Sequence, residues 1–239
     1  MKYLRTLTIQ EPLTKGRIMI RAIAFDFDGV LVESVDVKTH AYTHLFEEEE
    51  SEKIEKIRKY HLENGGISRF EKFRYIYKNI LRRSLSDEEF HSFCERFSRL
   101  VVDEVIASPW VAGAREFLQE YKKEYIFFII SGTPHEELTD IVRSRGMERY
   151  FKETLGSPGS KEKLLSDVMQ RHALDPKQLV FVGDAETDWN AAQKTKVSFI
   201  WRRTSENVPQ LKGFSGASIS SLLQLPDSLS HLCSGVKSH

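Results

Sequence analysis

Short apolar runs alternate with helical patterns over most of this chain. Several runs are apolar enough to be strands of a parallel sheet that is buried on both faces. The predicted strands are residues 22–27, 125–130, 152–155, 179–182 and 197–201. The helical patterns between and after them cover residues 113–123, residues 135–145, the segment from Lys161 onward, and residues 219–225. This alternation predicts an α/β fold built on a parallel sheet.

A long helical stretch, residues 35–107, separates the first strand from the rest of this alternation. Apolar and aromatic side chains recur along it at helical spacing, and we interpret these stripes as the core of a helical unit. Ser86 and Glu89 form a capping box at the start of its last helix. A strand, a helical insert and a return to strand–helix alternation predict two domains. These are a core of residues 1–34 and 108–239 and a cap domain of residues 35–107.

Composition narrows the class of protein without naming a function. Lys plus Arg and Asp plus Glu number 35 each, so the net charge is zero and no nucleic-acid partner is expected. No apolar stretch approaches the roughly 18 residues of a membrane span, and the amino terminus lacks the apolar core of a secretion signal. We therefore expect a cytoplasmic protein without a membrane partner, with Cys94 and Cys233 as free thiols. Residues 1–18 carry no clear pattern and are interpreted as an extension.

The most informative residues stand where the first strand ends. Asp26 and Asp28 follow the apolar run one residue apart, and in an extended stretch their side chains point to the same side. Buried carboxylates at a strand end are costly unless a metal ion or a reaction offsets them. One aspartate can attack a substrate while the other transfers a proton, and Gly29 lets the chain turn away. A calcium loop would need further ligands at alternate positions and a closing Glu, which this sequence lacks.

Polar residues also follow two later strands, and a lysine opens the helix between them. A hydroxyl and free backbone amides at a strand end suit a phosphoryl oxygen, and Ser is a favoured residue in front of a helix. The residues concerned are Ser131, Gly132 and Thr133 after the strand at 125–130, Lys161 behind Ser160, and the carboxylate pair Asp184 and Asp188 after the strand at 179–182.

Asp-x-Asp-Gly, Ser-Gly-Thr, a lysine and Gly-Asp-x-x-x-Asp, in this order, resemble the motifs of the haloacid dehalogenase superfamily. The likeness is greatest to its phosphatases and phosphomutases with a helical cap after the first strand, the phosphoglycolate phosphatase type included, and covers about residues 19–225. The resemblance implies a Rossmann-like core, an aspartyl-phosphate intermediate and one Mg²⁺ ion. By this resemblance, Asp26 is the nucleophile and a metal ligand, and Asp28 is the general acid/base whose backbone carbonyl also binds the metal. Ser131 supplies the phosphate-binding hydroxyl, with Gly132 and Thr133 as further substrate contacts, and Lys161 is the charge-balancing lysine. Asp184, with Asp188 behind it, supplies the metal carboxylates.

Charge explains why such a site needs a cation. A phosphate ester and an aspartate repel each other, and Mg²⁺ held by one or two carboxylates is the usual solution. Lys161 would neutralise the nucleophile and the transferring phosphoryl oxygens as a point charge. Asp28 must be protonated to serve a leaving alkoxide, which predicts a raised pKa for that carboxyl group. Dehalogenases of the resembled superfamily do not need the second aspartate, so its presence favours phosphoryl transfer.

A glycine-rich segment between cap helices is a candidate for substrate recognition. Residues 64–69 interrupt two helical patterns with Gly65 and Gly66 and then place a positive charge at Arg69. In capped members of the resembled superfamily, the loop between cap helices closes over the active site and reads the leaving group. Arg69 and Lys72 are therefore predicted to contact the substrate. The alternative is a plain turn with a solvated arginine, and the two glycines fit a hinge and a close approach equally well.

The sequence thus predicts a Mg²⁺-dependent phosphatase of a small phosphorylated metabolite, as a monomer or weak homodimer. A phosphomutase similar to β-phosphoglucomutase is the alternative, because Arg69 and Lys72 would also suit the second phosphate of a bisphosphate. A third interpretation is a non-catalytic domain in which Asp26 accepts a phosphoryl group as a signal. Receiver domains of that kind have no large helical insert after the first strand. The sequence does not identify the metabolite, because no general rule relates the residues of the cap to the substrate that they bind.

Overall fold

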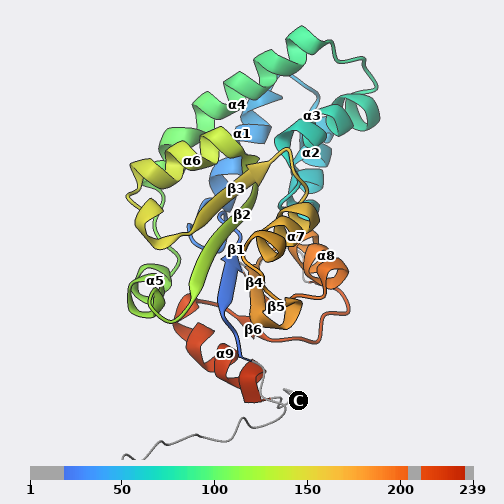
Figure 1. The fold of residues 1–239 in the computed structure, drawn as a ribbon. Helices are drawn as coiled ribbons and strands as arrows, with labels where there is room; N and C mark the ends of the chain where they lie inside the picture. Colours follow the sequence, from blue (N-terminus) through green and yellow to red (C-terminus); the bar gives the residue numbers. More distant parts are fainter. Residues whose placement is uncertain (1–18, 204–210, 235–239) are drawn as a thin grey trace, which may run out of the picture.

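The computed structural model describes residues 19–203 and 211–234. Over these residues, six parallel strands form one sheet in the order β3-β2-β1-β4-β5-β6 (Figure 1). The strands are β1 (Ala22–Phe25), β2 (Ile126–Pro134), β3 (Glu153–Ser157), β4 (Leu179–Gly183), β5 (Ser198–Arg202) and β6 (Ser218–Ile219). The predicted α/β fold with a Rossmann-like parallel sheet is confirmed. Residues 1–18, interpreted as an extension, lie outside the described residues.

β1 is the central strand, and its position follows from its composition. It pairs in parallel with β2 on one side and with β4 on the other. All its side chains are buried, as expected for a parallel strand that is covered on both faces. Ile23 and Phe25 face one hydrophobic cluster, while Ala22 and Ala24 face the other.

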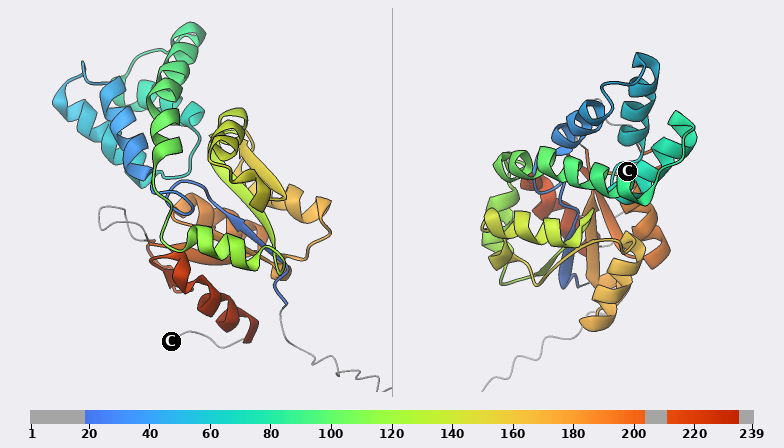
Figure 2. Two further views of the ribbon diagram at one scale, coloured as in Figure 1. Left: turned by 90° about the vertical axis from the view of Figure 1, so that its left-hand side faces the viewer. Right: turned by 90° about the horizontal axis from the view of Figure 1, so that it is seen from above.

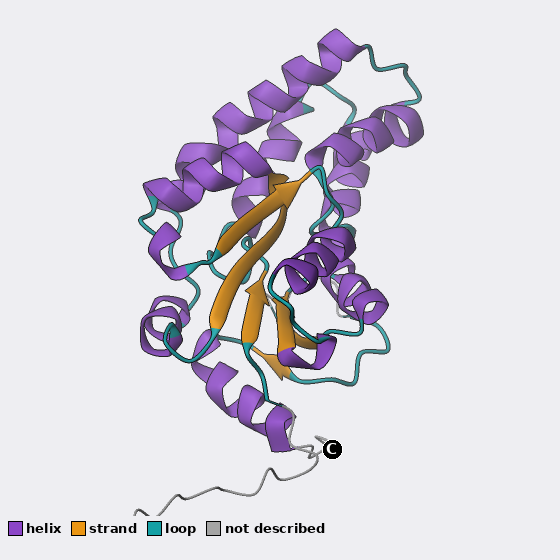
Figure 3. Ribbon diagram, in the orientation of Figure 1, coloured by secondary structure: helices purple, strands orange, loops and turns teal. Residues whose placement is uncertain are grey.

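Helices cover both faces of this sheet (Figure 3). One group packs on the face of Ile23 and Phe25, and the other on the face of Ala22 and Ala24. The first group is α5 (Ala114–Tyr121), α6 (His135–Ser144) and α9 (Leu225–Ser234), and the second is α7 (Lys161–Arg171) and α8 (Glu186–Thr195). Short 3₁₀ turns lie at η2 (Glu148–Tyr150), η3 (Pro176–Gln178) and η4 (Leu222–Gln224). Among the described residues, no helix is both long and apolar enough to cross a membrane.

The helices that follow β1 form a separate layer at the carboxyl ends of the strands (Figures 1 and 2). They are α1 (Val35–Leu45), α2 (Ser51–Glu63), α3 (Arg69–Tyr75), the π-helical segment η1 (Ile76–Leu81) and α4 (Asp87–Ala107). We call α1 to α4 with their connections the cap. The capping box predicted at the start of α4 is present, because Ser86 Oγ accepts from the Glu89 N–H and the Glu89 carboxylate accepts from the Ser86 N–H. Active sites of open α/β sheets lie at this edge of the sheet.

An aromatic cluster holds the cap helices together. The ring of Phe73 on α3 is fully buried, with its centroid 5.5 Å from Tyr42 of α1 and 5.7 and 5.9 Å from Phe93 and Phe97 of α4. Tilted and edge-on contacts of this kind are favourable beyond the area that they bury. The aromatic stripes of the sequence are therefore the core of the cap.

The closing helix predicted over residues 219–225 is present, but it begins later than expected. Ser218–Ile219 instead pairs with β5 as the edge strand β6, and α9 begins only at Leu225. Pro226 is compatible with the first turn of α9, because the N–H groups there have no intrahelical acceptor. Leu225 and Leu229 then pack against the sheet.

Phe73→Ala is expected to lower the free energy of unfolding by about 3–5 kcal/mol, because it leaves a cavity among the cap helices. Urea denaturation followed by circular dichroism measures the loss. Tyr75→Ala is the matched control on the same helix, since Tyr75 is 42% exposed, and its loss should be about 1 kcal/mol or less. Equal losses for the two variants would contradict an aromatic core at Phe73.

Candidate active site

Asp26 and Asp28 leave the sheet at the carboxyl end of β1. The Asp26 N–H donates to the carbonyl oxygen of Val182 (2.9 Å), which extends the pairing with β4 and fixes Asp26 at the sheet edge. Gly29 then turns the chain with a φ of +73°, and a Cβ atom there would overlap the Asp184 carboxylate. Glycine is therefore needed both for the backbone of this loop and for the approach of Asp184.

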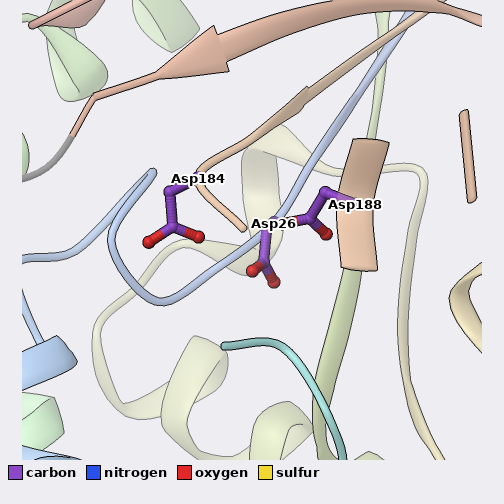
Figure 4. A group of neighbouring side chains, drawn as sticks. All are labelled: Asp26, Asp184 and Asp188. Atoms are coloured by element: carbon purple, nitrogen blue, oxygen red, sulfur yellow. The ribbon is translucent and has the colours of Figure 1, made fainter. Parts of the chain in front are cut away.

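Three carboxylates meet at the ends of β1 and β4 (Figure 4). Asp184 directly follows β4, and Asp188 stands in the first turn of α8. Each of them, like Asp26, contributes a carboxylate oxygen to a group in which all oxygens lie within 4.8 Å of one another. Such oxygens are the ligands that Mg²⁺ prefers, so the cluster fits this ion.

Asp188 already has protein donors for both of its oxygens. Oδ1 accepts from Lys161 Nζ at 2.5 Å and Oδ2 from the Ala185 N–H at 3.1 Å, in a fully buried position. These contacts favour Asp188 as the residue that holds Lys161 in place. Its predicted role as a direct metal ligand stays a prediction.

Burial makes the carboxylate cluster electrostatically unfavourable. Burial raises the pKa of Asp26 from 3.8 to about 7, which Lys161 opposes and the charges of Asp188 and Asp28 reinforce. Burial, together with the charges of Asp26 and Asp188, also holds the pKa of Asp184 well above its usual range. A bound divalent cation would favour the ionised carboxylates and remove this penalty.

Lys161 is the cation within this cluster. Ser160 Oγ caps α7 by accepting from the Lys163 N–H, so Lys161 stands at the first helical position, next to Asp26. Its Nζ lies 2.9 Å from Asp26 Oδ2 and 2.5 Å from Asp188 Oδ1. Burial lowers the pKa of Lys161, but the two carboxylates raise it above its ordinary value, so the side chain is charged. This position fits the charge-balancing role expected of it.

The Asp28 side chain points to α1 and the end of β2 instead of the cluster. Its carboxylate accepts from Ser34 Oγ (2.7 Å), Lys38 Nζ (2.5 Å) and Thr133 Oγ1 (3.2 Å). Burial raises the pKa of Asp28, but the ion pair with Lys38 and these hydrogen bonds bring the pKa below its ordinary value. The raised pKa expected from the sequence is wrong, because the contribution of Lys38 was missed. Metal binding by the Asp28 carbonyl stays a prediction.

The end of β2 presents Ser131, Gly132 and Thr133 to the same pocket as Asp26. Ser131 is buried, and its Oγ accepts from the Thr133 N–H (3.2 Å). Thr133 Oγ1 accepts from Lys38 Nζ (2.8 Å) and thereby joins Lys38 to Asp28. The predicted role of the Ser131 hydroxyl in binding a phosphoryl oxygen stays a prediction.

The two glycines of the cap loop lie against the core. Gly66 has a φ of +74°, and a Cβ atom on it would lie 2.7 Å from Lys161 Nζ. A Cβ atom on Gly132 would overlap the Gly66 carbonyl oxygen. Thr187 Oγ1 also donates to the Gly65 carbonyl oxygen at 2.7 Å. Of the two roles considered for these glycines, a hinge and a close approach of the backbone to the core, the structure favours the close approach.

Arg69 and Lys72 both line the pocket, but their partners differ. Arg69 is buried, forms an ion pair with Glu137 of α6 and donates to Ser98 of α4 at 2.6 Å, so it joins the cap to the core. Lys72 hydrogen-bonds the ring of His61 at 2.9 Å. The plain turn with a solvated arginine is wrong, because Arg69 is buried and paired. Contact of Arg69 and Lys72 with a substrate stays a prediction.

These groups line one pocket between the cap and the strand ends. Its volume is about 950 Å³, which includes the open space at its mouth. Lys38 and His61 are two of the lining residues that sequence reasoning missed. Both stand in amphipathic helices among other polar residues that face solvent. No motif marks them, and only the packing of the cap onto the core brings them to the site.

Comparison with known families agrees with this geometry. A family model described as haloacid dehalogenase-like hydrolase matches residues 23–202. The chain belongs to this family. The resemblance drawn from the four motifs is confirmed, and the protein is an enzyme of the haloacid dehalogenase-like (HAD) hydrolases.

The relatives of this chain include phosphatases and a phosphomutase. A phosphoglycolate phosphatase from Aliivibrio fischeri is 25% identical over 190 residues, which cover 73% of this chain and 80% of that protein. A predicted phosphoglycolate phosphatase from Haemophilus somnus has a TM-score of 0.69 at 19% identity, covering 87% of this chain and 97% of that one. A β-phosphoglucomutase from Clostridium difficile has a TM-score of 0.71 at 18% identity, covering 91% and 98%. A Bacillus subtilis HAD-hydrolase bound to magnesium has a TM-score of 0.66 at 15% identity, covering 89% and 99%. At these identities, likeness to the solved structures shows the fold.

The metal-free HAD hydrolase is expected to lose stability as the pH rises from 3.8 to about 7, the ordinary and folded-state pKa values of Asp26. In this range the folded protein keeps a proton that the unfolded chain releases, so a rise in pH favours unfolding. Thermal melting between about pH 5 and about pH 8, with a chelator and with Mg²⁺, measures the effect. Asp184→Asn should reduce both the fall in melting temperature and its recovery by Mg²⁺.

Asp140→Asn is the matched control, because Asp140 is exposed on α6 and pairs with Arg143. It should behave like the wild type in both series. An unchanged Mg²⁺ response in Asp184→Asn would exclude Asp184 as a ligand.

Gly66→Ala is expected to lower the activity of this HAD hydrolase by about ten- to a hundredfold, because the added methyl group pushes the cap loop away from Lys161. Steady-state hydrolysis measures the loss. Gly146→Ala is the matched control, since Gly146 has a φ of +63° and nothing within 4 Å of an added Cβ atom. It should carry the same backbone strain with unchanged activity. Equal activity losses would mean that strain, not crowding at the site, is responsible.

Proposed function

We propose that this HAD hydrolase is a Mg²⁺-dependent phosphatase that hydrolyses a small phosphorylated metabolite through an aspartyl phosphate at Asp26. The observation that carries the proposal is the surroundings of Asp26. Asp26 is 3% exposed and lines the pocket, and its carboxylate lies 2.9 Å from Lys161 and within the group of carboxylates that fits a metal ion. A carboxylate placed between a lysine and a metal site can accept a dianionic phosphate that it would otherwise repel.

In the proposed reaction, an oxygen of Asp26 attacks phosphorus while the bond to the leaving alkoxide breaks. Water then attacks the aspartyl phosphate, which frees Asp26 and releases inorganic phosphate. Lys161 balances the charge on Asp26 and on the phosphoryl oxygens, and the Ser131 hydroxyl with the adjacent amides of Gly132 and Thr133 orients them. Mg²⁺ held by Asp26, Asp184 and the carbonyl of residue 28 would neutralise the same oxygens as a Lewis acid.

Asp28 is a base in the resting enzyme. Hydrogen bonds from Ser34, Lys38 and Thr133 favour its ionised form, which suits removal of a proton from the attacking water. To protonate the leaving alkoxide in the first half-reaction, Asp28 must itself first gain a proton. Displacement of Lys38 from Asp28 by the bound substrate would favour that protonation. Lys38 is thus a positioning residue in the proposed mechanism.

A phosphomutase similar to β-phosphoglucomutase is the second candidate. The observation that favours it is the buried Lys72 in the cap side of the pocket, where a second phosphate would lie. Arg69 is already paired with Glu137, which argues against a second phosphate bound by both Arg69 and Lys72. The third interpretation of the sequence, a non-catalytic phosphoacceptor, disagrees with the membership of this chain in a family of hydrolases, and Asp28 also favours turnover. A cytoplasmic location and a monomer or weak homodimer stay predictions.

Asp26→Asn is expected to lower phosphate release from p-nitrophenyl phosphate with Mg²⁺ by at least about a thousandfold, because the amide cannot attack phosphorus. The near-isosteric side chain should leave the fold intact, which circular dichroism checks. Asp140→Asn, on the exposed face of α6, serves again as the control and should keep full activity.

Assays of phosphate release and of phosphate transfer separate the candidate functions. Repeated release of phosphate supports the phosphatase, and transfer between a sugar monophosphate and a bisphosphate supports the mutase. One equivalent of protein-bound phosphate without turnover would contradict both candidates. Activity of Asp26→Asn above a few per cent of wild type, with deamidation excluded, would overturn the covalent mechanism.

A further inference from the structure

Lys72 is a buried ammonium group without a carboxylate partner among the described residues. It is 2% exposed, and its Nζ lies 2.9 Å from His61 Nδ1 and 3.3 Å from the His61 carbonyl oxygen. The Tyr42 ring centroid lies 5.5 Å from it. All these contacts come from α1 and α2 of the cap, and none of them carries a full negative charge.

The other cations that line the pocket are paired. Lys38 pairs with Asp28, and Arg69 pairs with Glu137. Removing an ammonium group from water without a counter-charge is unfavourable. Burial, followed by the positive charges of Lys38 and Lys161, accordingly lowers the pKa of Lys72 to about 7, although the carboxylates of Asp28 and Asp184 oppose the shift. A ligand that brings a negative charge to Lys72 would offset this cost.

His61 adds a neutral hydrogen-bond donor beside Lys72. It is 6% exposed, and its ring lies 4.6 Å from the ring of Tyr42, centroid to centroid. Burial, together with the nearby charges of Lys72 and Lys38, lowers the pKa of His61 well below its ordinary value, so the ring is neutral. Because Nδ1 accepts from Lys72, the proton of the neutral ring is on Nε2. Within the described residues, Nε2 has no hydrogen-bond partner.

Lys72 and His61 line the same pocket as Asp26 and Ser131. Asp26 and Ser131 belong to the core and stand at the strand ends, whereas Lys72 and His61 belong to α3 and α2 of the cap. The pocket therefore has one end for the transferring phosphoryl group and another end that offers an unpaired cation and a free N–H donor. The second end faces the part of a substrate that leaves as the alcohol.

We propose that Lys72 and His61 form a binding site for a second anionic group, so that the substrate is a small phosphate monoester whose alcohol carries a carboxylate or a further phosphate. This inference rests on the proposed phosphatase function, because it assigns the leaving group of that reaction. The anion completes the pairing of Lys72, and its oxygens accept from Lys72 Nζ and from His61 Nε2. Arg69, which is paired with Glu137, is left to hold the cap on the core.

The test compares substrates that differ only in this charge. One set consists of the phosphate esters of two- to four-carbon hydroxy acids, such as 2-phosphoglycolate, each against its neutral amide. The other consists of short diol bisphosphates, each against its monophosphate. Wild type should prefer at least one charged member by about ten- to a hundredfold in kcat/KM, and the set in which the preference occurs identifies carboxylate or phosphate. No preference in either set overturns the inference.

In Lys72→Met, the ratio of kcat/KM for the charged substrate to kcat/KM for its neutral counterpart should fall close to one. The variant should still hydrolyse p-nitrophenyl phosphate at nearly the wild-type rate. The substitution also removes the unpaired buried charge, so the substrate-free variant should melt at or above the wild-type temperature. His61→Asn keeps an acceptor near the position of Nδ1 and loses the Nε2 donor, so it should reduce the preference in part. A lower melting temperature of Lys72→Met with equal losses on all substrates means a structural lysine and overturns the inference.

Lys56→Met is the matched control, because Lys56 lies on α2 with 59% of its side chain exposed and pairs with Glu52. It should keep the wild-type preference and rates. Failure of the proposed function gives a different result, since wild type would then release no phosphate from any monoester. The two failures are therefore distinguishable in one set of assays.

Discussion

The mutual repulsion of carboxylates at the ends of β1 and β4 is the constraint on which the rest of this structure depends. Asp26, Asp184 and Asp188 are buried together because these strands are parallel neighbours whose ends meet at one edge of the sheet. Within the described residues, Lys161 is the one cation in ion-pair contact with this group. The folded chain therefore holds closely spaced carboxylates whose repulsion a bound divalent cation would relieve.

The same constraint explains why glycines surround the site. Gly29 makes room for the Asp184 carboxylate, and Gly66 lets the cap loop reach Lys161. Side chains at either position would separate groups that must touch. The cap thus lies on the core through backbone contacts, reinforced by the buried Arg69–Glu137 pair.

Asp28 connects the core residues of the proposed reaction to the cap. Its carboxylate contacts Thr133 of the core and Lys38 of α1, the first cap helix, so the protonation of Asp28 depends on where α1 lies. The core supplies Asp26, Asp28 and Ser131 to the pocket, and the cap supplies Lys38, His61 and Lys72. In our proposals, the core residues perform the reaction and the cap residues choose the substrate.

The sequence by itself determined the α/β fold, the place of the helical insert, and the residues at the strand ends. These signals are local: apolar runs set the strands, and the residue after each run marks a strand end. The sequence did not predict the ion pair of Lys38 with Asp28 or that of Arg69 with Glu137. It also did not predict that Lys72 is buried beside His61, without a carboxylate partner among the described residues. Lys38 and Asp28 are separated by 10 positions, and Arg69 and Glu137 by 68. Partners so distant meet only when the cap packs on the core, so their charges and pKa values were decided by the tertiary structure.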